Sequence, residues 1–246
     1  MIVFRSIVFN AVFYLNLAAF LVLGSWLLIT PRTWSMAALK ALSRVLQWWL
    51  EAIAGTRMEV RGAEHVPTGA ALVAGKHQSM WETFALFQLF DDPAMVMKRE
   101  LMWLPFLGWF AHKFGMIPVD RAARGTALKS LLRRAEAAIA DNRQIIVFPE
   151  GTRRAPDAPP DYKSGATALY LKLGVPCVPF ALNSGLFWPR RKLLRRPGTI
   201  VVEFLPAIPP GLTRKQFERR LIAAIEPATA RLIAEARREL DAPHRP

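Results

Sequence analysis

A histidine and a carboxylate with spacing suited to acid–base chemistry stand in the segment Lys76–Glu82, KHQSMWE. The segment separates a short apolar run, residues 70–74, from a longer one, residues 83–90, which predicts a strand, a turn and a helix. A side chain at such a turn is held rigidly and can face a cleft. His77 can then act as a general base while Glu82 orients its ring and stabilises the imidazolium, as in catalytic triads.

The same residues have a structural alternative. Ser79 and Glu82 have the spacing of a capping box, in which the serine begins a helix and the glutamate reaches back to the serine N–H. A lone histidine is also more often structural than catalytic. The choice between a base and a cap therefore depends on other segments of the chain.

A second polar segment, Glu150–Arg154, follows the most strand-like run, residues 144–148. Gly151 allows a ligand to approach the backbone closely, and Thr152 supplies a hydroxyl. Arg153 supplies the planar fork of N–H donors that suits phosphate. The segment predicts an anion-binding loop, with an ordinary polar loop as the alternative.

Strands and helices alternate through the globular part, which predicts an α/β fold with a mostly parallel central sheet flanked by helices. In such sheets ligands bind beyond the carboxyl ends of the strands. His77, Arg121 and Glu150 each directly follow an expected strand, which predicts a shared site, although a salt bridge from Arg121 to Asp120 is the alternative there. The expected strands are residues 58–60, 70–74, 94–97, 115–119, 144–148, 176–182 and 200–204. The expected helices are residues 83–90, 99–114 with a bend at Pro105 and Gly108, 125–142, 164–173 and 213–240, the last broken or kinked at Pro227.

The first 55 residues predict a two-helix membrane anchor. Residues 56–246 are the expected α/β domain with its C-terminal amphipathic helix. Ser6–Thr30 contains no charged residue. As a helix it would be roughly 36 Å long, enough to cross a hydrocarbon core of about 30 Å. Residues 34–54 have an amphipathic pattern that suits the membrane interface or packing on the domain. A single span and a hairpin in one leaflet both fit, and a span would place the more basic C-terminal side in the cytoplasm.

Composition points to an anionic partner. The chain has 246 residues, 52% of them hydrophobic, and a net charge of +14. Such a balance suits nucleic acid, a phospholipid surface or an acidic substrate. Long apolar runs favour the phospholipid surface, and no nucleic-acid-binding motif is evident. The basic segment Trp188–Arg196 is a candidate contact for lipid head groups, with a solvated loop as the alternative.

Four blocks follow one another along the sequence: His77-x4-Glu82, Gly115-x5-Arg121, Phe148–Arg153 (FPEGTR) and Val175–Pro179 (VPCVP). In this order and spacing they resemble the glycerolipid acyltransferases of the 1-acylglycerol-3-phosphate acyltransferase family. The resemblance covers roughly residues 57–206. The family usually carries Asp at the position of Glu82 and often Ser at the position of Arg154. Arg154 is therefore a second arginine beside the expected phosphate site.

The resemblance implies a glycerol-phosphate-acyltransferase-like fold and transfer of a fatty acyl group from acyl-ACP (acyl carrier protein) or acyl-CoA. The acceptor would be the sn-2 hydroxyl of 1-acyl-sn-glycerol 3-phosphate (lysophosphatidic acid), and the product phosphatidic acid. His77 and Glu82 would be the catalytic pair, with no metal and no cofactor besides the thioester co-substrate. The enzyme would work on the cytoplasmic face of the inner (plasma) membrane, against anionic phospholipid. The substrate-binding residues would be Lys98, Arg121, Glu150, Gly151, Thr152 and Arg153.

Alternatives exist for the acceptor and the mechanism. The acceptor could be a lyso-ornithine lipid or a lysophospholipid, and the chain could be a non-catalytic lipid-binding membrane protein. A covalent acyl-enzyme would need a nucleophile, but Ser79 lacks a Gly-x-Ser-x-Gly elbow and Cys177 lies in an apolar segment typical of packing, so direct transfer is expected. Acyl-chain length would depend on an apolar groove, whose candidate residues, equally suited to the core or a membrane, are Trp103, Phe106, Trp109 and Phe110.

Overall fold

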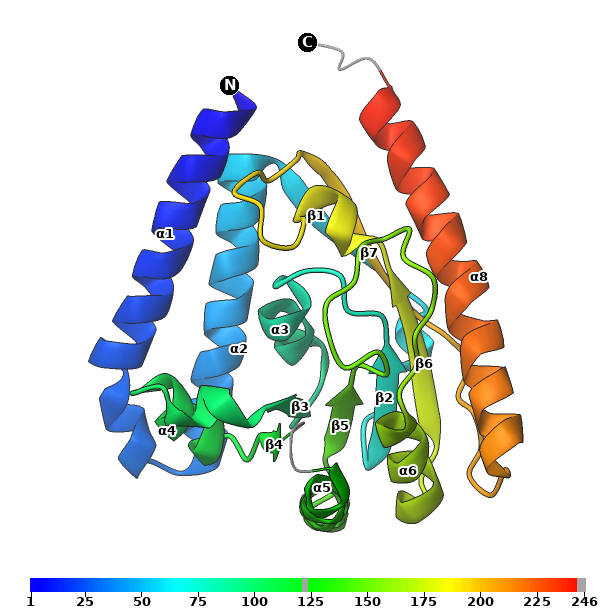
Figure 1. Ribbon diagram of the computed structural model, residues 1–246. Coiled ribbons are helices and arrows are strands. Elements are labelled where there is room, and N and C mark those ends of the chain that lie inside the picture. Colours follow the sequence, from blue (N-terminus) through cyan, green and yellow to red (C-terminus); the bar gives the residue numbers. More distant parts are fainter. Residues whose placement is uncertain (121–123, 243–246) are drawn as a thin grey trace.

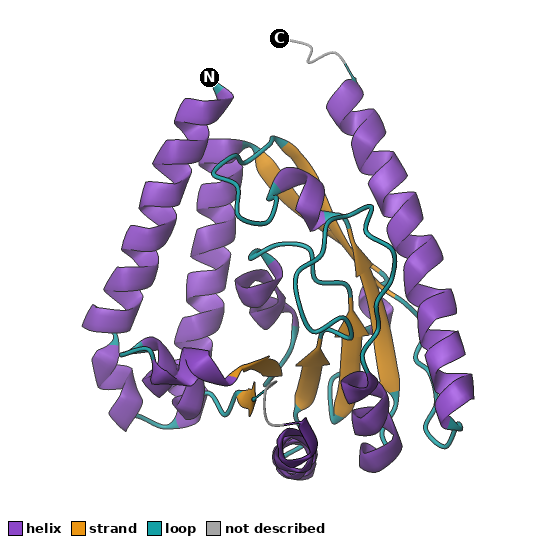
Figure 2. Ribbon diagram, in the orientation of Figure 1, coloured by secondary structure: helices purple, strands orange, loops and turns teal. Residues whose placement is uncertain are grey.

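The computed structural model describes residues 1–120 and 124–242. These residues form a seven-stranded sheet with helices packed around it (Figures 1 and 2). The strand order is β1-β7-β6-β2-β5-β3-β4. Neighbouring strands pair in parallel except β6 and β7, which are antiparallel. Each expected strand is present, so the predicted α/β fold is confirmed. The strands are β1 (Thr56–Arg61), β2 (Ala71–Gly75), β3 (Ala94–Lys98), β4 (Ile117–Val119), β5 (Gln144–Val147), β6 (Cys177–Leu182) and β7 (Gly198–Phe204).

Helices cover both faces of the sheet, because successive strand residues point to opposite sides. In β2, Val73 joins an apolar core with helices α1 to α4, whereas Leu72 and Ala74 join a second core with α5, α6 and α8. The α-helices are α1 (Ile2–Leu23), α2 (Arg32–Trp49), α3 (Glu82–Ala85), α4 (Leu107–Lys113), α5 (Arg124–Ala140), α6 (Ser164–Leu173), α7 (Ser184–Phe187) and α8 (Arg214–Asp241). Shorter helical turns are η1 (Ser25–Ile29), η2 (Leu50–Ala54), η3 (Ala63–His65), η4 (Leu86–Leu89) and η5 (Arg99–Trp103).

The two N-terminal helices lie side by side against the domain (Figure 1). Helix α1 is long and apolar enough to cross a membrane, with 22 residues and a mean hydropathy of 2.1. One side of it is nevertheless bound to the domain: Phe9 and Phe13 pack edge-on against the Trp188 ring, with centroids 5.4 and 5.3 Å away. The Asn10 side-chain oxygen accepts a hydrogen bond from buried Arg195 at 2.7 Å. Trp188 and Arg195 are therefore packing residues, in contrast to their expected contact with head groups.

Three expected helices differ in extent. Residues 99–114 were expected as one bent helix, but η5 and α4 are separated by non-helical residues, and a Cβ on Gly108 would lie 2.0 Å from the Met102 carbonyl oxygen. The expected helix 83–90 is the short α3 followed by η4. Helix α8 is continuous through Pro227, so of the expected break or kink the break does not occur. The lost hydrogen bond is offset by burial of apolar side chains on both sides of the proline, namely Phe217, Leu221, Ile225, Leu232 and Ile233.

Candidate active site

The carboxyl ends of five parallel strands, β2 to β6, meet at one edge of the sheet. A cleft of about 920 Å³ opens there, beyond β2, β3 and β5. Glu82 is fully buried and Arg121 lies outside the described residues, so neither belongs to the described lining. The cleft brings together the other predicted site residues, which are His77, Lys98, Glu150, Gly151, Thr152 and Arg153.

His77 follows the end of β2 and is half-buried in the wall of the cleft. Its ring stacks on Phe148, with centroids 4.1 Å apart and planes 16° from parallel. Its carbonyl oxygen accepts a hydrogen bond from the Arg154 N–H at 2.8 Å. The ring and backbone are thus both held by the segment after β5, while the imidazole borders the space where a ligand would sit.

Glu82 holds the turn that follows His77. Its Oε1 accepts hydrogen bonds from the Gln78 N–H at 2.8 Å, the Ser79 N–H at 3.0 Å and the Ser184 hydroxyl at 2.8 Å. The hydrogen bond from the Ser79 N–H to the Glu82 carboxylate is one of the two bonds of a capping box. The other bond is absent, because the Ser79 hydroxyl oxygen accepts the Trp81 N–H instead of the Glu82 N–H. Burial raises the pKa of the Glu82 carboxyl, and the N–H donors oppose that rise. Orientation of the His77 ring by Glu82 stays a prediction.

We expect Glu82→Ala to lower the free energy of unfolding by about 3 kcal/mol, because it leaves buried donors without an acceptor. Denaturant titration in detergent measures this loss. Glu82→Gln is the matched control: it keeps an oxygen where the three donors converge, so its loss is expected to be clearly smaller. Equal stability of wild type and Glu82→Ala would show that the turn does not depend on this carboxylate.

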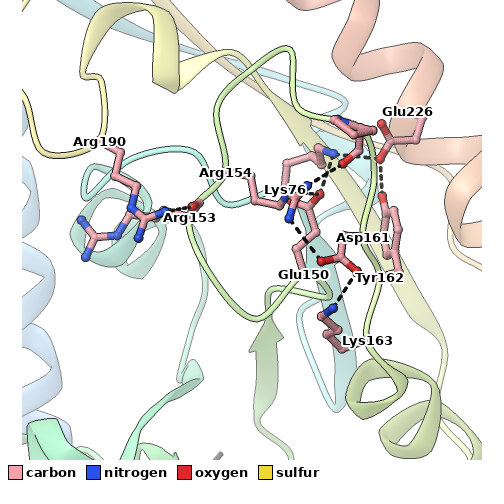
Figure 3. Close-up of polar contacts among 10 residues, drawn as sticks. Lys76, Glu150, Arg153, Arg154, Asp161, Tyr162, Lys163, Arg190 and Glu226 are labelled. Carbon is pink, nitrogen blue, oxygen red and sulfur yellow. Dashed lines mark hydrogen bonds and ion pairs between the residues drawn. The ribbon is translucent and has the colours of Figure 1, made fainter.

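The loop after β5 separates its two arginines (Figure 3). Arg153 lines the cleft, and its carbonyl oxygen accepts a hydrogen bond from Arg190 at 2.7 Å. Arg154 points to the other side of the loop, where it binds Asp161 at 3.2 Å. Gly151 adopts a left-handed conformation, with φ of +66°, which glycine reaches without strain. The extra arginine in this segment therefore does not compete with Arg153 for a ligand in the cleft.

The cleft has a positive lining. Its acidic residues are Asp120, which accepts a hydrogen bond from Arg99 at 2.9 Å, and Glu150, which is paired with buried Lys76 at 3.0 Å. Such a lining attracts an anionic ligand. Its basic residues are Lys98, Arg153, Lys163, Arg190 and Arg191.

Sequence reasoning overlooked several of these residues. Lys76 and Tyr162 contact the site from behind: Lys76 directly precedes the His77 block, whereas Tyr162 lies outside all four blocks. Arg190 and Arg191 line the cleft, although they were expected to meet lipid head groups. The expected groove residues lie elsewhere: Trp103 and Trp109 are exposed, Phe110 is buried, and neither they nor Phe106 line this cleft.

The two alternative nucleophiles are poorly placed. Cys177 is fully buried in β6, and burial raises the pKa of its thiol, which disfavours the thiolate. Ser79 is also fully buried, and its hydroxyl oxygen accepts the Trp81 N–H at 2.8 Å. Neither residue lines the described cleft. The geometry therefore favours direct transfer over an acyl-enzyme.

Comparison with known proteins places this site in a family. The Acyltransferase family matches residues 57–183, a stretch that contains every predicted site residue. The 1-acyl-sn-glycerol-3-phosphate acyltransferase of Pseudomonas aeruginosa is 38% identical over 161 residues, which cover 65% of this chain and 63% of that protein. The human 1-acyl-sn-glycerol-3-phosphate acyltransferase alpha is 30% identical over 174 residues, which cover 69% of this chain and 62% of that protein. The chain thus matches just under two thirds of the length of these relatives.

The fold has a counterpart among solved structures. The crystal structure of the 1-acyl-sn-glycerophosphate (LPA) acyltransferase PlsC from Thermotoga maritima matches with a TM-score of 0.73 and 20% sequence identity. That match covers 100% of both chains and shows that they share the fold. Because the family match covers more than half of its length, this chain belongs to the acyltransferase family.

Proposed function

We propose that this protein transfers a fatty acyl group from acyl-CoA or acyl-ACP to the sn-2 hydroxyl of 1-acyl-sn-glycerol 3-phosphate, giving phosphatidic acid. The main support is that one cleft holds a histidine suited to act as a base and a set of cations suited to phosphate. The names of the relatives from Pseudomonas and human point to the same acceptor.

In the proposed mechanism His77 takes the proton of the acceptor hydroxyl as its oxygen attacks the thioester carbonyl carbon. The resulting tetrahedral intermediate collapses, the C–S bond breaks, and the thiol leaves with the proton returned by His77. Arg153 and Lys98 hold the phosphate, which keeps the hydroxyl close to the base and the thioester. Glu150 helps to position the acceptor indirectly, because it is paired with Lys76 and directly precedes the Gly151–Arg153 loop. Arg121 is assigned to the phosphate site because it is the last residue of the second block, Gly115-x5-Arg121.

The acyl chain fits the apolar part of the cleft. Burial of a methylene group contributes about 0.8 kcal/mol, so an apolar wall beside the charged residues favours a long-chain substrate. The wall replaces the aromatic groove expected from the sequence. It includes Met95, Met97, Leu101, Leu128 and Leu131.

The membrane-binding surface proposed here is the end of the molecule formed by η1, the start of α2, η5 and α4. These elements contact one another. Exposed aromatic side chains on such a surface suit the membrane interface. Because α1 is also fixed to the domain through Asn10 and Phe13, a hairpin resting in one leaflet, on the cytoplasmic face of the inner membrane, fits better than a detached span. The tryptophans of the surface are Trp26, Trp34, Trp103 and Trp109, which are 57%, 60%, 70% and 54% exposed.

We expect the double variant Trp103→Ala/Trp109→Ala to bind vesicles of anionic phospholipid about 30-fold more weakly, because each of the two rings loses apolar burial of the order of 1 kcal/mol. Co-sedimentation of the detergent-depleted protein measures the partition coefficient. Ile222→Ala removes an exposed apolar side chain from α8, on another side of the molecule, and is expected to bind like wild type. Unchanged binding of the double variant would show that this end of the molecule is not the membrane-binding surface.

The test of the proposed function is acyl transfer to 1-acyl-sn-glycerol 3-phosphate in mixed micelles, with acyl-CoA and acyl-ACP assayed separately. Formation of phosphatidic acid with either donor supports the proposal, and the ratio of kcat/KM values identifies the preferred donor. Acylation of a lyso-ornithine lipid or a lysophospholipid in place of this acceptor would refute the acceptor assignment. Binding without any turnover would point to a non-catalytic lipid-binding protein.

A further inference from the structure

Helix α8 reaches the back of the candidate active site, although it lies beyond the residues matched by the family. It packs along β6 and β7, and Glu226 stands midway along it, directly before Pro227 (Figure 1). The Glu226 side chain points towards Lys76, the residue between β2 and His77 (Figure 3). A residue from the C-terminal helix thus contacts the catalytic edge of the sheet.

Lys76 connects this helix to the cleft. Its Nζ lies 3.0 Å from Oε1 of Glu150 and 3.0 Å from Oε1 of Glu226. The Tyr162 hydroxyl donates a second hydrogen bond to the same Glu226 oxygen at 2.7 Å. The Lys76 side chain is only 3% exposed, and a buried ammonium is costly unless it is paired and hydrogen-bonded. The lysine therefore depends on both carboxylates.

The charges in this network balance. Its three cations are Lys76, Arg154 and Lys163, and its three anions are Glu150, Asp161 and Glu226. Glu150 also lines the cleft, and its Oε2 is buried without a hydrogen-bond partner within residues 1–120 and 124–242. Because Glu150 directly precedes the Gly151–Arg153 loop, its pair with Lys76 fixes the start of that loop beside the turn that carries His77.

We propose that Glu226 is a positioning residue: it shares the charge of Lys76 and so keeps the Lys76–Glu150 pair, and with it the Gly151–Arg153 loop, in place beside the cleft. This inference rests on the proposed function. Without the Glu226 charge, buried Lys76 would have Glu150 as its one carboxylate partner among the described residues, and the ion pair that fixes the start of the Gly151–Arg153 loop would shift. Because Lys76 is the residue before His77, the same contact also fixes the start of the catalytic turn.

The test compares Glu226→Gln with wild type in acyl transfer to 1-acyl-sn-glycerol 3-phosphate. Glutamine keeps an oxygen for Lys76 and Tyr162 and removes only the charge. We expect the KM for the acceptor to rise about tenfold, with kcat changed less than about threefold and the KM for the donor unchanged. Glu226→Asp restores the charge and is expected to recover part of the acceptor affinity. Tyr162→Phe removes a single hydrogen bond and is expected to raise the same KM about twofold.

Glu235→Gln is the matched control. Glu235 lies on the same helix, forms an ion pair with Arg61 at 2.7 Å, and has a side chain 30% exposed, against 25% for Glu226. It lies outside the described lining of the cleft, so its loss is expected to affect stability and not the acceptor KM. An unchanged acceptor KM in Glu226→Gln, or an equal rise in Glu235→Gln, would overturn the inference while leaving the proposed function intact. If wild type neither binds nor acylates this acceptor, both the proposed function and the inference are refuted. If wild type binds the acceptor without turnover, the inference is tested by comparing the Kd of wild type with that of Glu226→Gln.

Discussion

Replacing His77 with alanine is expected to lower kcat for acyl transfer by about 10²–10⁴-fold, the usual contribution of a positioned general base. An alcohol attacks a thioester slowly until its proton is removed, and His77 supplies the imidazole that borders the cleft. The KM for the acceptor is expected to change little, because the phosphate is held by other residues. Initial rates in mixed micelles, at saturating concentrations of both substrates, measure the effect.

The controls separate lost chemistry from lost structure. His112→Ala removes a histidine that lines a smaller cavity beside η1 and α4, and it is expected to keep the wild-type kcat. Because His77 stacks on Phe148, His77→Gln retains part of the packing while lacking a comparable base, and it is expected to be as inactive as His77→Ala. Full activity in a folded His77→Ala protein would show that His77 is not the general base and that the turn has only a structural role.

The parts of this molecule that sequence predicts well are those governed by local patterns. Each of the seven strands was expected because short, β-branched or apolar runs between turn residues are a local property. The parallel arrangement then brings segments after β2, β3 and β5 to one edge, which explains why His77, Lys98 and Arg153 line one cleft.

The parts that sequence does not predict depend on long-range contacts. Glu226 and Lys76 are 150 positions apart, and Glu82 and Ser184 are 102 apart, so neither pairing follows from a local pattern. Helix α8 passes through Pro227 because buried apolar residues flank the proline, a tertiary effect that outweighs the local preference. The helix expected over residues 99–114 is interrupted at residues 104–106, where Phe106 has a φ of +60°, and this fold of the chain brings Met102 too close to Gly108 for a side chain there.

Arg153 is expected to carry the second large effect, on acceptor binding. Arg153→Ala removes a guanidinium from the positive wall of the cleft, and we expect the KM for 1-acyl-sn-glycerol 3-phosphate to rise about 10–100-fold. Arg153→Lys keeps the charge but loses the planar fork, so its KM is expected to lie between those of wild type and the alanine variant. kcat at saturating acceptor is expected to fall much less than in His77→Ala.

The decisive comparison changes the substrate as well as the residue. A monoacylglycerol lacks the phosphate, so wild type and Arg153→Ala are expected to use it equally poorly if Arg153 acts on the phosphate. Arg154→Ala serves as the neighbouring control: its side chain pairs with Asp161 at 3.2 Å and with Glu150 at 3.7 Å and does not line the described cleft, so it is expected to raise the acceptor KM less than Arg153→Ala. If Arg153→Ala impairs the phosphate-free acceptor by the same factor, the arginine supports the loop rather than the phosphate. The specificity for a phosphorylated acceptor would then have to come from the other cations of the cleft.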